Sequence, residues 1–200
     1  LDEMLKLDCE IFLPGHGFPI LGKKRIKKAL ETTSKFLRSI EDQTLKLMNQ
    51  GKSLNQVLHE VEIPNDLMEL PWLTPIYDDP QFLIRMIWRR YGGWWDGEYD
   101  RLLPAPRKEE ALAWVELSNG IDNIILKALE YLDKGNFKVA AQLIETAFHA
   151  DNDNNQMHDA RAKIYREFSL KQSSSMGRNI LNHASMASAQ GKRDLAQTED

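Results

Sequence analysis

The sequence predicts a mainly α-helical protein, a bundle of helices preceded by a short strand and loop. Apolar residues recur at helical spacing along most of the chain, and signals rich in glycine, proline and serine separate these periodic stretches. The composition, with 42% hydrophobic and 28% charged residues, is that of a folded globular chain rather than a disordered one.

Charge and apolar run length argue against two classes of function. The net charge is −4 at pH 7, so we expect no nucleic-acid partner, because phosphate binding needs a basic face. The basic residues from Lys23 to Lys28 are interpreted as the solvated side of a helix. No apolar run reaches the roughly 18 residues of a membrane-spanning helix, so we predict no membrane span.

The N-terminal residues contain the candidate for metal chemistry. Residues 1–7 are typical of a helix end and residues 9–13 of a strand, which leads into a loop with His16 between Gly15 and Gly17. The glycines allow close approach of a ligand, and a rigid strand end suits a metal ligand. These residues alone leave two interpretations open, a metal ligand or a structural histidine in a tight loop.

Helical spacing continues over residues 23–50, and Gly51 supplies the stop because it tolerates a left-handed conformation. Ser53 is a candidate cap for a short helix that Pro64 ends. Four of the chain's eight prolines follow within residues 64–80, which predicts an irregular segment and a candidate domain boundary.

Asp79 and Pro80 predict the next helix start, as its cap and first residue. This helix ends at a glycine pair, and the turn sequence Trp-Trp-Asp-Gly follows. Tryptophans crowd this region of the sequence, and two interpretations stay open: hot spots of an interface, or a core joint between domains. The tryptophans concerned are Trp72, Trp88, Trp94 and Trp95.

From Arg107 onward the pattern is entirely helical. Helices are predicted over residues 108–118 and 121–134 and in three later segments, with breaks at Gly135, at the polar run 151–155 and at Ser173–Ser175. The expected domains are residues 1–22, 23–106 and 107–189, followed by a disordered tail at 190–200.

Residues 121–155 fit a tetratricopeptide-like pair of helices. Small residues at Ala140 and Ala147 would let two antiparallel helices approach closely, and Gly135 would make the turn. Only one full repeat is visible, so we interpret the segment as a self-association module rather than a peptide-binding array.

The remaining histidines do not form a catalytic or metal pattern. None of His59, His149, His158 and His183 has another histidine at helical spacing, and each is interpreted as a helix-surface or partly buried residue. No Gly-x-Ser-x-Gly, His-Glu-x-x-His or phosphate-binding glycine motif occurs.

The histidine loop and two later stretches together resemble a known enzyme family. The Pro-Gly-His-Gly-x-Pro core within Leu7–Gly22 resembles the last metal-binding loop of the metallo-β-lactamase superfamily, where a strand delivers a histidine to zinc. The stretch 85–97, which ends in Gly-Trp-Trp-Asp-Gly, and residues 135–153 resemble the C-terminal half of alkyl sulfatases. These are zinc hydrolases that combine a metallo-β-lactamase domain with a helical dimerisation domain.

The resemblance implies roles for two residues. His16 matches a zinc ligand, and Arg85 matches an arginine that helps to form the family's sulfate site. An arginine can hold an anionic ester bidentately, whereas the alternative for Arg85 is a helix-face residue paired with a carboxylate. Residues 1–22 would be the remnant, a strand and loop, of an αββα metallo-β-lactamase domain.

The resemblance also implies what this portion does. The family's HxHxDH motif would lie upstream of Leu1, and a catalytic zinc takes about three protein ligands. We therefore expect a C-terminal fragment of a zinc-dependent alkyl sulfatase-like hydrolase, inactive alone, that forms a homodimer and part of the cleft for an anionic ester. The alternative is a stand-alone helical interaction module without a catalytic role. The sequence leaves the localisation undetermined.

Overall fold

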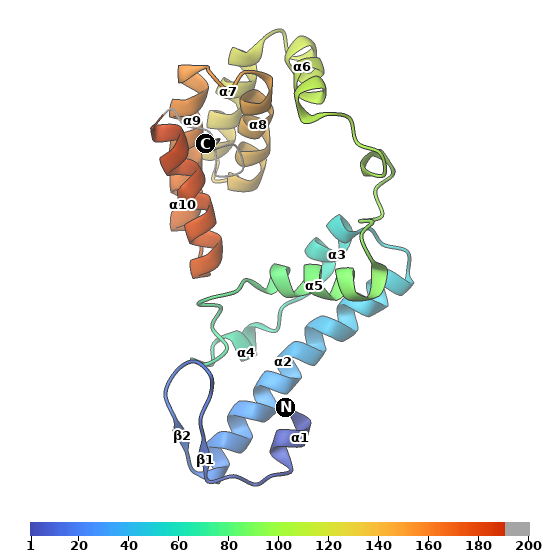
Figure 1. The fold of residues 1–200 in the computed structure, drawn as a ribbon, viewed down its shortest axis with the longest axis vertical. Coiled ribbons are helices and arrows are strands. Elements are labelled where there is room, and N and C mark those ends of the chain that lie inside the picture. Colours follow the sequence, from blue (N-terminus) through green and yellow to red (C-terminus); the bar gives the residue numbers. More distant parts are fainter. Residues whose placement is uncertain (191–200) are drawn as a thin grey trace, which may run out of the picture. The chain divides into compact units, whose positions relative to one another are not determined.

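A computed structural model describes residues 1–190 of the chain and confirms the mainly α-helical prediction (Figure 1). The chain divides into two compact units. Among the described residues, the first holds Leu1–Pro75 and Asp79–Leu102, and the second holds Ile76–Asp78 and residues 103–190. The domain boundaries expected at residues 22, 106 and 189 stay predictions, and residues 191–200 of the expected disordered tail lie outside the described residues.

The first unit begins with a small hairpin. Helix α1 (Asp2–Leu5) precedes strands β1 (Ile11–Phe12) and β2 (Ile20–Leu21), which pair antiparallel with Ile11 opposite Leu21. The sequence predicted the first strand over residues 9–13, of which only Ile11 and Phe12 pair, and it did not predict β2, which becomes a strand only by pairing with β1. Just after β2, the Gly22 N–H donates to the Glu10 carbonyl oxygen at 2.8 Å and closes the hairpin.

The core of the first unit lies between three helices. The long helix α2 (Lys23–Asn49) packs against α3 (Leu54–Glu60) and α5 (Pro80–Gly92). Two further short elements are α4 (Asn65–Met68), within the segment expected to be irregular, and the 3-10 helix η1 (Tyr99–Arg101). The core of the first unit contains the buried apolar residues Phe36, Ile40, Val57, Ile84 and Trp88.

The predicted helix starts in this unit are confirmed. The Ser53 hydroxyl accepts from the Gln56 N–H, and the Gln56 side chain accepts from the Ser53 N–H, which together form a capping box. The Asp79 carboxylate accepts from the Gln81 N–H at 2.8 Å, with Pro80 as the first residue of α5.

The second unit consists of helices, most of which pack on a neighbour in sequence. These are α6 (Arg107–Leu117), α7 (Ile121–Asp133), α8 (Phe137–Ala150), α9 (Asn155–Leu170) and α10 (Ser175–Ala189). Each of α7, α8 and α9 packs on the helix that follows it, and α6 packs on α8 (Figure 1). The helices predicted from periodicity are therefore confirmed, whereas their likeness to a tetratricopeptide pair stays a prediction.

Small side chains lie where these helices meet. Ala128, Ala140 and Ala147 are fully buried, together with Ile144 and Ile164. Gly135 turns the chain between α7 and α8 with a φ of 74°, in the left-handed region that glycine adopts without strain.

A buried ionic network joins α8, α9 and α10. The Arg161 side chain is only 2% exposed; its Nε donates to Glu145 Oε1 at 2.6 Å, and its Nη1 donates to Ser188 Oγ at 2.9 Å. The guanidinium also lies over the Phe148 ring, 4.4 Å from the ring centroid. Arg161 therefore fixes two neighbouring helices to α9.

His158 belongs to the same network, so its interpretation as a surface or partly buried residue is wrong. It is 5% exposed, with Nε2 lying 2.8 Å from the Asn152 carbonyl oxygen and Nδ1 lying 3.2 Å from Ser188 Oγ. Because a carbonyl only accepts, Nε2 carries the proton and Nδ1 can accept from the serine hydroxyl. The long sequence separation from Ser188 hid this contact from sequence reasoning.

Within residues 1–190, no helix is both long and apolar enough to cross a membrane.

Candidate functional site

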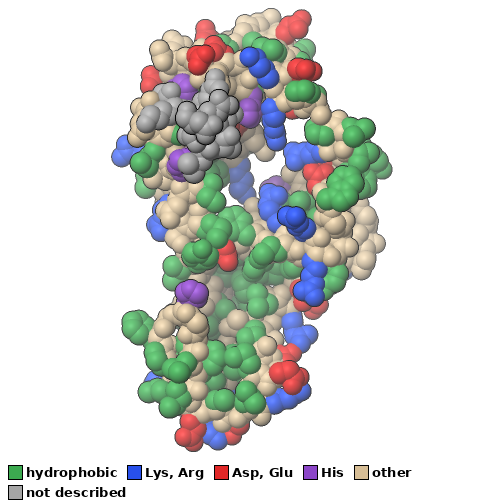
Figure 2. Space-filling view, viewed as in Figure 1, with side chains coloured by type: hydrophobic (Ala, Val, Ile, Leu, Met, Phe, Trp, Pro, Cys, Tyr) green, Lys and Arg blue, Asp and Glu red, His purple; other side chains and the backbone are tan. Residues whose placement is uncertain are grey.

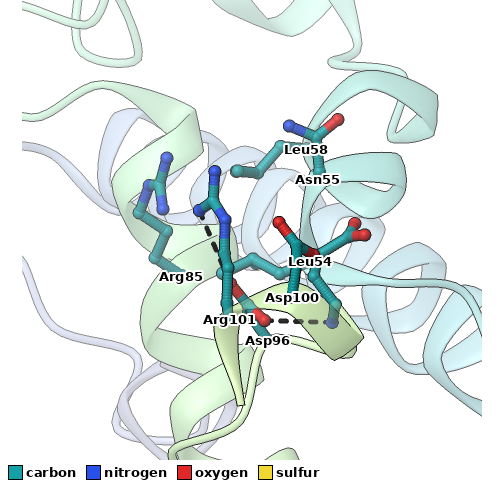
Figure 3. Close-up of a pocket in the computed structure, with 8 residues that line it drawn as sticks. Leu54, Asn55, Leu58, Arg85, Asp96, Asp100 and Arg101 are labelled. Carbon is teal, nitrogen blue, oxygen red and sulfur yellow. Dashed lines mark hydrogen bonds and ion pairs between the residues drawn. The ribbon is translucent and has the colours of Figure 1, made fainter. Parts of the chain in front are cut away.

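The structure places Arg85 in a pocket of about 350 Å³ in the first unit (Figure 3). Ile84, its neighbour on α5, points into the core, so the Arg85 side chain emerges on the exposed side of the helix. Residues of α3 and of the segment after α5 complete the pocket: Leu54, Asn55, Leu58, Asp96, Glu98, Asp100 and Arg101.

The Gly-Trp-Trp-Asp-Gly stretch forms one wall of the pocket, and hydrogen bonds to α3 and α5 hold it there. The Leu54 N–H donates to the Asp96 carbonyl oxygen at 2.8 Å, and Trp88 Nε1 donates to the Trp95 carbonyl oxygen at 2.9 Å. Gly97 has a φ of 85°, and a Cβ there would lie 3.1 Å from the Ser53 Cα. A glycine is therefore required where this stretch passes the start of α3.

The carboxylate Asp96 in this pocket is already engaged. Its Oδ1 accepts from the Glu98 N–H at 3.0 Å, and its Oδ2 lies 3.5 Å from Arg101 Nη1. Arg85 forms no ion pair with any of residues 1–190. The alternative interpretation, in which Arg85 pairs with a carboxylate on the helix face, is therefore not observed in this part of the chain. Figure 3 shows the Arg85 and Arg101 side chains extending in the same direction. Since Arg101 lies beside Asp96, it is the guanidinium of Arg85 that stays available to an anion.

His16 lies apart from this pocket, in the exposed turn between β1 and β2. Its neighbour Gly17 has a φ of 95°, which agrees with the expected tight loop. Among the described residues, no three His, Cys, Asp or Glu side chains gather closely enough to hold a metal. His16 is thus a single candidate ligand, and the described residues alone do not fit a catalytic zinc.

The hairpin that carries His16 exposes apolar side chains. Ile11, Leu13 and Phe18 are 61%, 71% and 90% exposed, and Figure 2 shows hydrophobic side chains gathered over this part of the first unit. The loop therefore presents its imidazole beside an uncovered apolar surface.

The crowded tryptophans differ in burial, and their two interpretations, interface hot spots or a core joint between domains, stay predictions. Trp88 is a core residue, and Trp95 is half-buried with its Nε1 donating to the Glu98 carbonyl oxygen at 3.0 Å. Trp94 is 81% exposed and Trp72 is 44% exposed, so neither side chain is buried in the core of the first unit.

Sequence reasoning missed a groove of about 720 Å³ in the second unit, between α6, α7 and α8. Trp114, Leu126 and Leu143 line it, and the first two are more than half exposed. The sequence did offer one signal, the apolar residues Trp114 and Leu117, which lie three residues apart and so share a face of α6. The structure shows that both are more than half exposed.

These features define a class of protein: a mainly helical protein that carries an open arginine pocket and a glycine-flanked histidine. Residues 53–191 match the family model described as alkyl sulfatase dimerisation. This match spans more than half of the chain, which therefore belongs to the alkyl sulfatase dimerisation family.

Comparison with individual proteins agrees with this assignment. The chain is 29% identical over 167 residues to a linear primary-alkylsulfatase of Pseudomonas sp., covering 83% of this chain and 32% of that protein. It is 27% identical over 183 residues to an alkyl/aryl-sulfatase of Saccharomyces cerevisiae, covering 91% of this chain and 28% of that protein. The chain thus spans about a third of the length of these relatives.

A solved structure shows the same fold. The stereoselective inverting sec-alkylsulfatase Pisa1 from Pseudomonas sp. superposes with a TM-score of 0.89 at 23% identity, covering 96% of this chain and 31% of that chain. The expected resemblance to alkyl sulfatases of the metallo-β-lactamase superfamily is confirmed.

Proposed function

We propose that this chain is the dimerisation portion of a zinc-dependent alkyl sulfatase-like hydrolase, where it joins two copies and forms part of the substrate cleft. The match of residues 53–191 to the dimerisation family carries the proposal. That span contains the Arg85 pocket and the helices α6 to α10, so assembly and cleft formation reside in one stretch of chain.

The homodimer is tested by the mass of the 200-residue chain in solution. Sedimentation equilibrium at micromolar concentration should give twice the 23.1 kDa of one chain. A mass of one chain across that concentration range would contradict the proposal.

In the intact hydrolase, His16 would be one zinc ligand among several. Zinc would there supply a Lewis acid and an activated water, which is the chemistry that such sites provide. Because the described residues offer one ligand where about three are needed, we expect this chain to be inactive alone. Hydrolysis of a primary alkyl sulfate by the purified chain with zinc added, abolished by His16→Ala, would contradict that expectation.

Arg85 would hold the anionic group of the ester substrate. The support is its open guanidinium at the pocket wall and the engagement of Asp96 with other partners. Arg85→Lys keeps the charge but removes bidentate geometry, so binding of a short primary alkyl sulfate, followed by calorimetry, should weaken about tenfold. Arg89→Lys, an exposed position on the same helix, is the matched control and should leave binding unchanged.

A further inference from the structure

The groove of the second unit is mostly apolar at its floor and walls. Ile124 is 5% exposed at its base, whereas Trp114 and Leu126 are 54% and 59% exposed on its sides. The polar side chains around it are uncharged except for one cation and one anion: Ser118, Asn123, Lys127, Glu130, Gln142 and Thr146.

The polar residues around the groove form its rim. The two charged residues of this rim, Lys127 and Glu130, lie on one face of α7 and neutralise each other. Lys127 Nζ lies 2.7 Å from Glu130 Oε2, three residues along α7. The hydrogen bond with Lys127 lowers the pKa of the Glu130 carboxyl, and the same bond raises the pKa of Lys127, so both stay charged near neutral pH. The rim therefore has no net charge but a fixed order of cation and anion.

This order makes the surface self-complementary. Under a two-fold rotation the same patch of one copy faces itself on the other, and antiparallel α7 helices would bring each lysine to the glutamate of the opposite copy. The neutral rim would not attract a strongly acidic or strongly basic partner, because it has no net charge of opposite sign. The exposed Trp114 and Leu117 next to this rim supply the aromatic and aliphatic anchors that interfaces favour.

We propose that the groove between α6, α7 and α8 is the surface on which a second copy of this chain docks, with the Trp114 ring of each copy seated in the groove of the other. The inference rests on the proposed homodimer and names the surface that forms it. All residues that line the groove lie within the span matched to the dimerisation family, 53–191.

The test is sedimentation velocity of the 200-residue chain and of single variants. Leu126→Glu places a charge on the apolar wall and should raise the dimer dissociation constant at least about thirtyfold, as for loss of an interface hot spot. Ile180→Glu is the matched control, because Ile180 is 63% exposed on α10 of the same unit but does not line the groove. Circular dichroism confirms that each variant keeps its helices.

A charge-reversal pair tests the two-fold geometry and avoids the apolar wall. Lys127→Glu and Glu130→Lys should each weaken self-association, because every copy then presents two like charges. An equimolar mixture of the two variants should recover the dimer, since acidic and basic rims then face each other.

The outcomes separate the inference from the function on which it rests. A dimeric wild-type chain with a weakened Leu126→Glu variant, an unchanged Ile180→Glu variant and a rescued mixture supports the groove. A dimeric wild-type chain whose groove variants all stay dimeric overturns the groove and leaves the homodimer standing. A monomeric wild-type chain overturns both.

Discussion

The two compact units hold their helices together in different ways. In the first unit, α2 packs on α5, which follows it only after a long connection, and the segment 94–98 must dock on α3 and α5 to complete the pocket. In the second unit, α7, α8, α9 and α10 each pack on a neighbour in sequence. Local packing needs only short turns, whereas the first unit depends on contacts between distant residues.

The chemistry of the two cores differs as well. The first unit's buried cluster is apolar and centres on Ile40, Ile84 and Trp88. The second adds the buried Arg161 network to its apolar cluster. An apolar core tolerates approximate placement of its residues, but a buried charge must meet its partners or remain unpaired.

The largest expected change in the free energy of unfolding comes from the contact between segment 94–98 and α5 in the first unit. Trp88→Ala should lower the free energy of unfolding by about 4 kcal/mol, because a buried ring and its hydrogen bond to Trp95 are both lost. Trp94→Ala, at an 81% exposed position, should change it by less than about 0.5 kcal/mol. Urea unfolding followed by circular dichroism measures both; equal effects would remove the distinction between core and surface tryptophans.

A somewhat smaller effect is expected from the ionic network of the second unit. Arg161→Ala should lower the free energy of unfolding by about 3 kcal/mol, because Glu145 loses its partner and the contact of α9 with α10 loses its anchor. Arg166→Ala, on the exposed side of α9, should stay within about 0.5 kcal/mol of the wild type.

For Arg161→Ala, fluorescence and circular dichroism together can test whether the two units unfold separately. Four of the five tryptophans lie in the first unit, so fluorescence reports mainly on that unit and circular dichroism on both. We expect Arg161→Ala to shift the dichroism transition more than the fluorescence transition. Identical shifts would show that the two units unfold as one.

The smallest of the three effects tests the close approach of α7 and α8. Ala140 is fully buried there, so Ala140→Leu should overpack the contact and lower the free energy of unfolding by about 2 kcal/mol. Ala113→Leu, an exposed position on α6, provides the matched control. A thermal melt that shows no loss for Ala140→Leu would contradict the tight contact.

Sequence alone could place most of the elements. Helical periodicity and the caps at Ser53 and Asp79 predicted the helices, because these signals depend on residues close together in the chain. Strand β2 was missed, since its two residues become a strand only by pairing with β1. The same holds for the candidate site. Arg85 was identified from its motif, but the sequence did not predict which residues line the pocket around it.

Local patterning by itself thus determined that the chain is helical, where its helices begin and end, and which family it resembles. Only the tertiary structure decided that Ser188 meets His158 and Arg161, that Asp96 meets the start of α3, and that α6 leaves a groove beside α7. The physical reason is that these contacts join residues far apart in the chain. Periodicity specifies which face of a helix is apolar, but the packing of the other helices decides whether that face is covered.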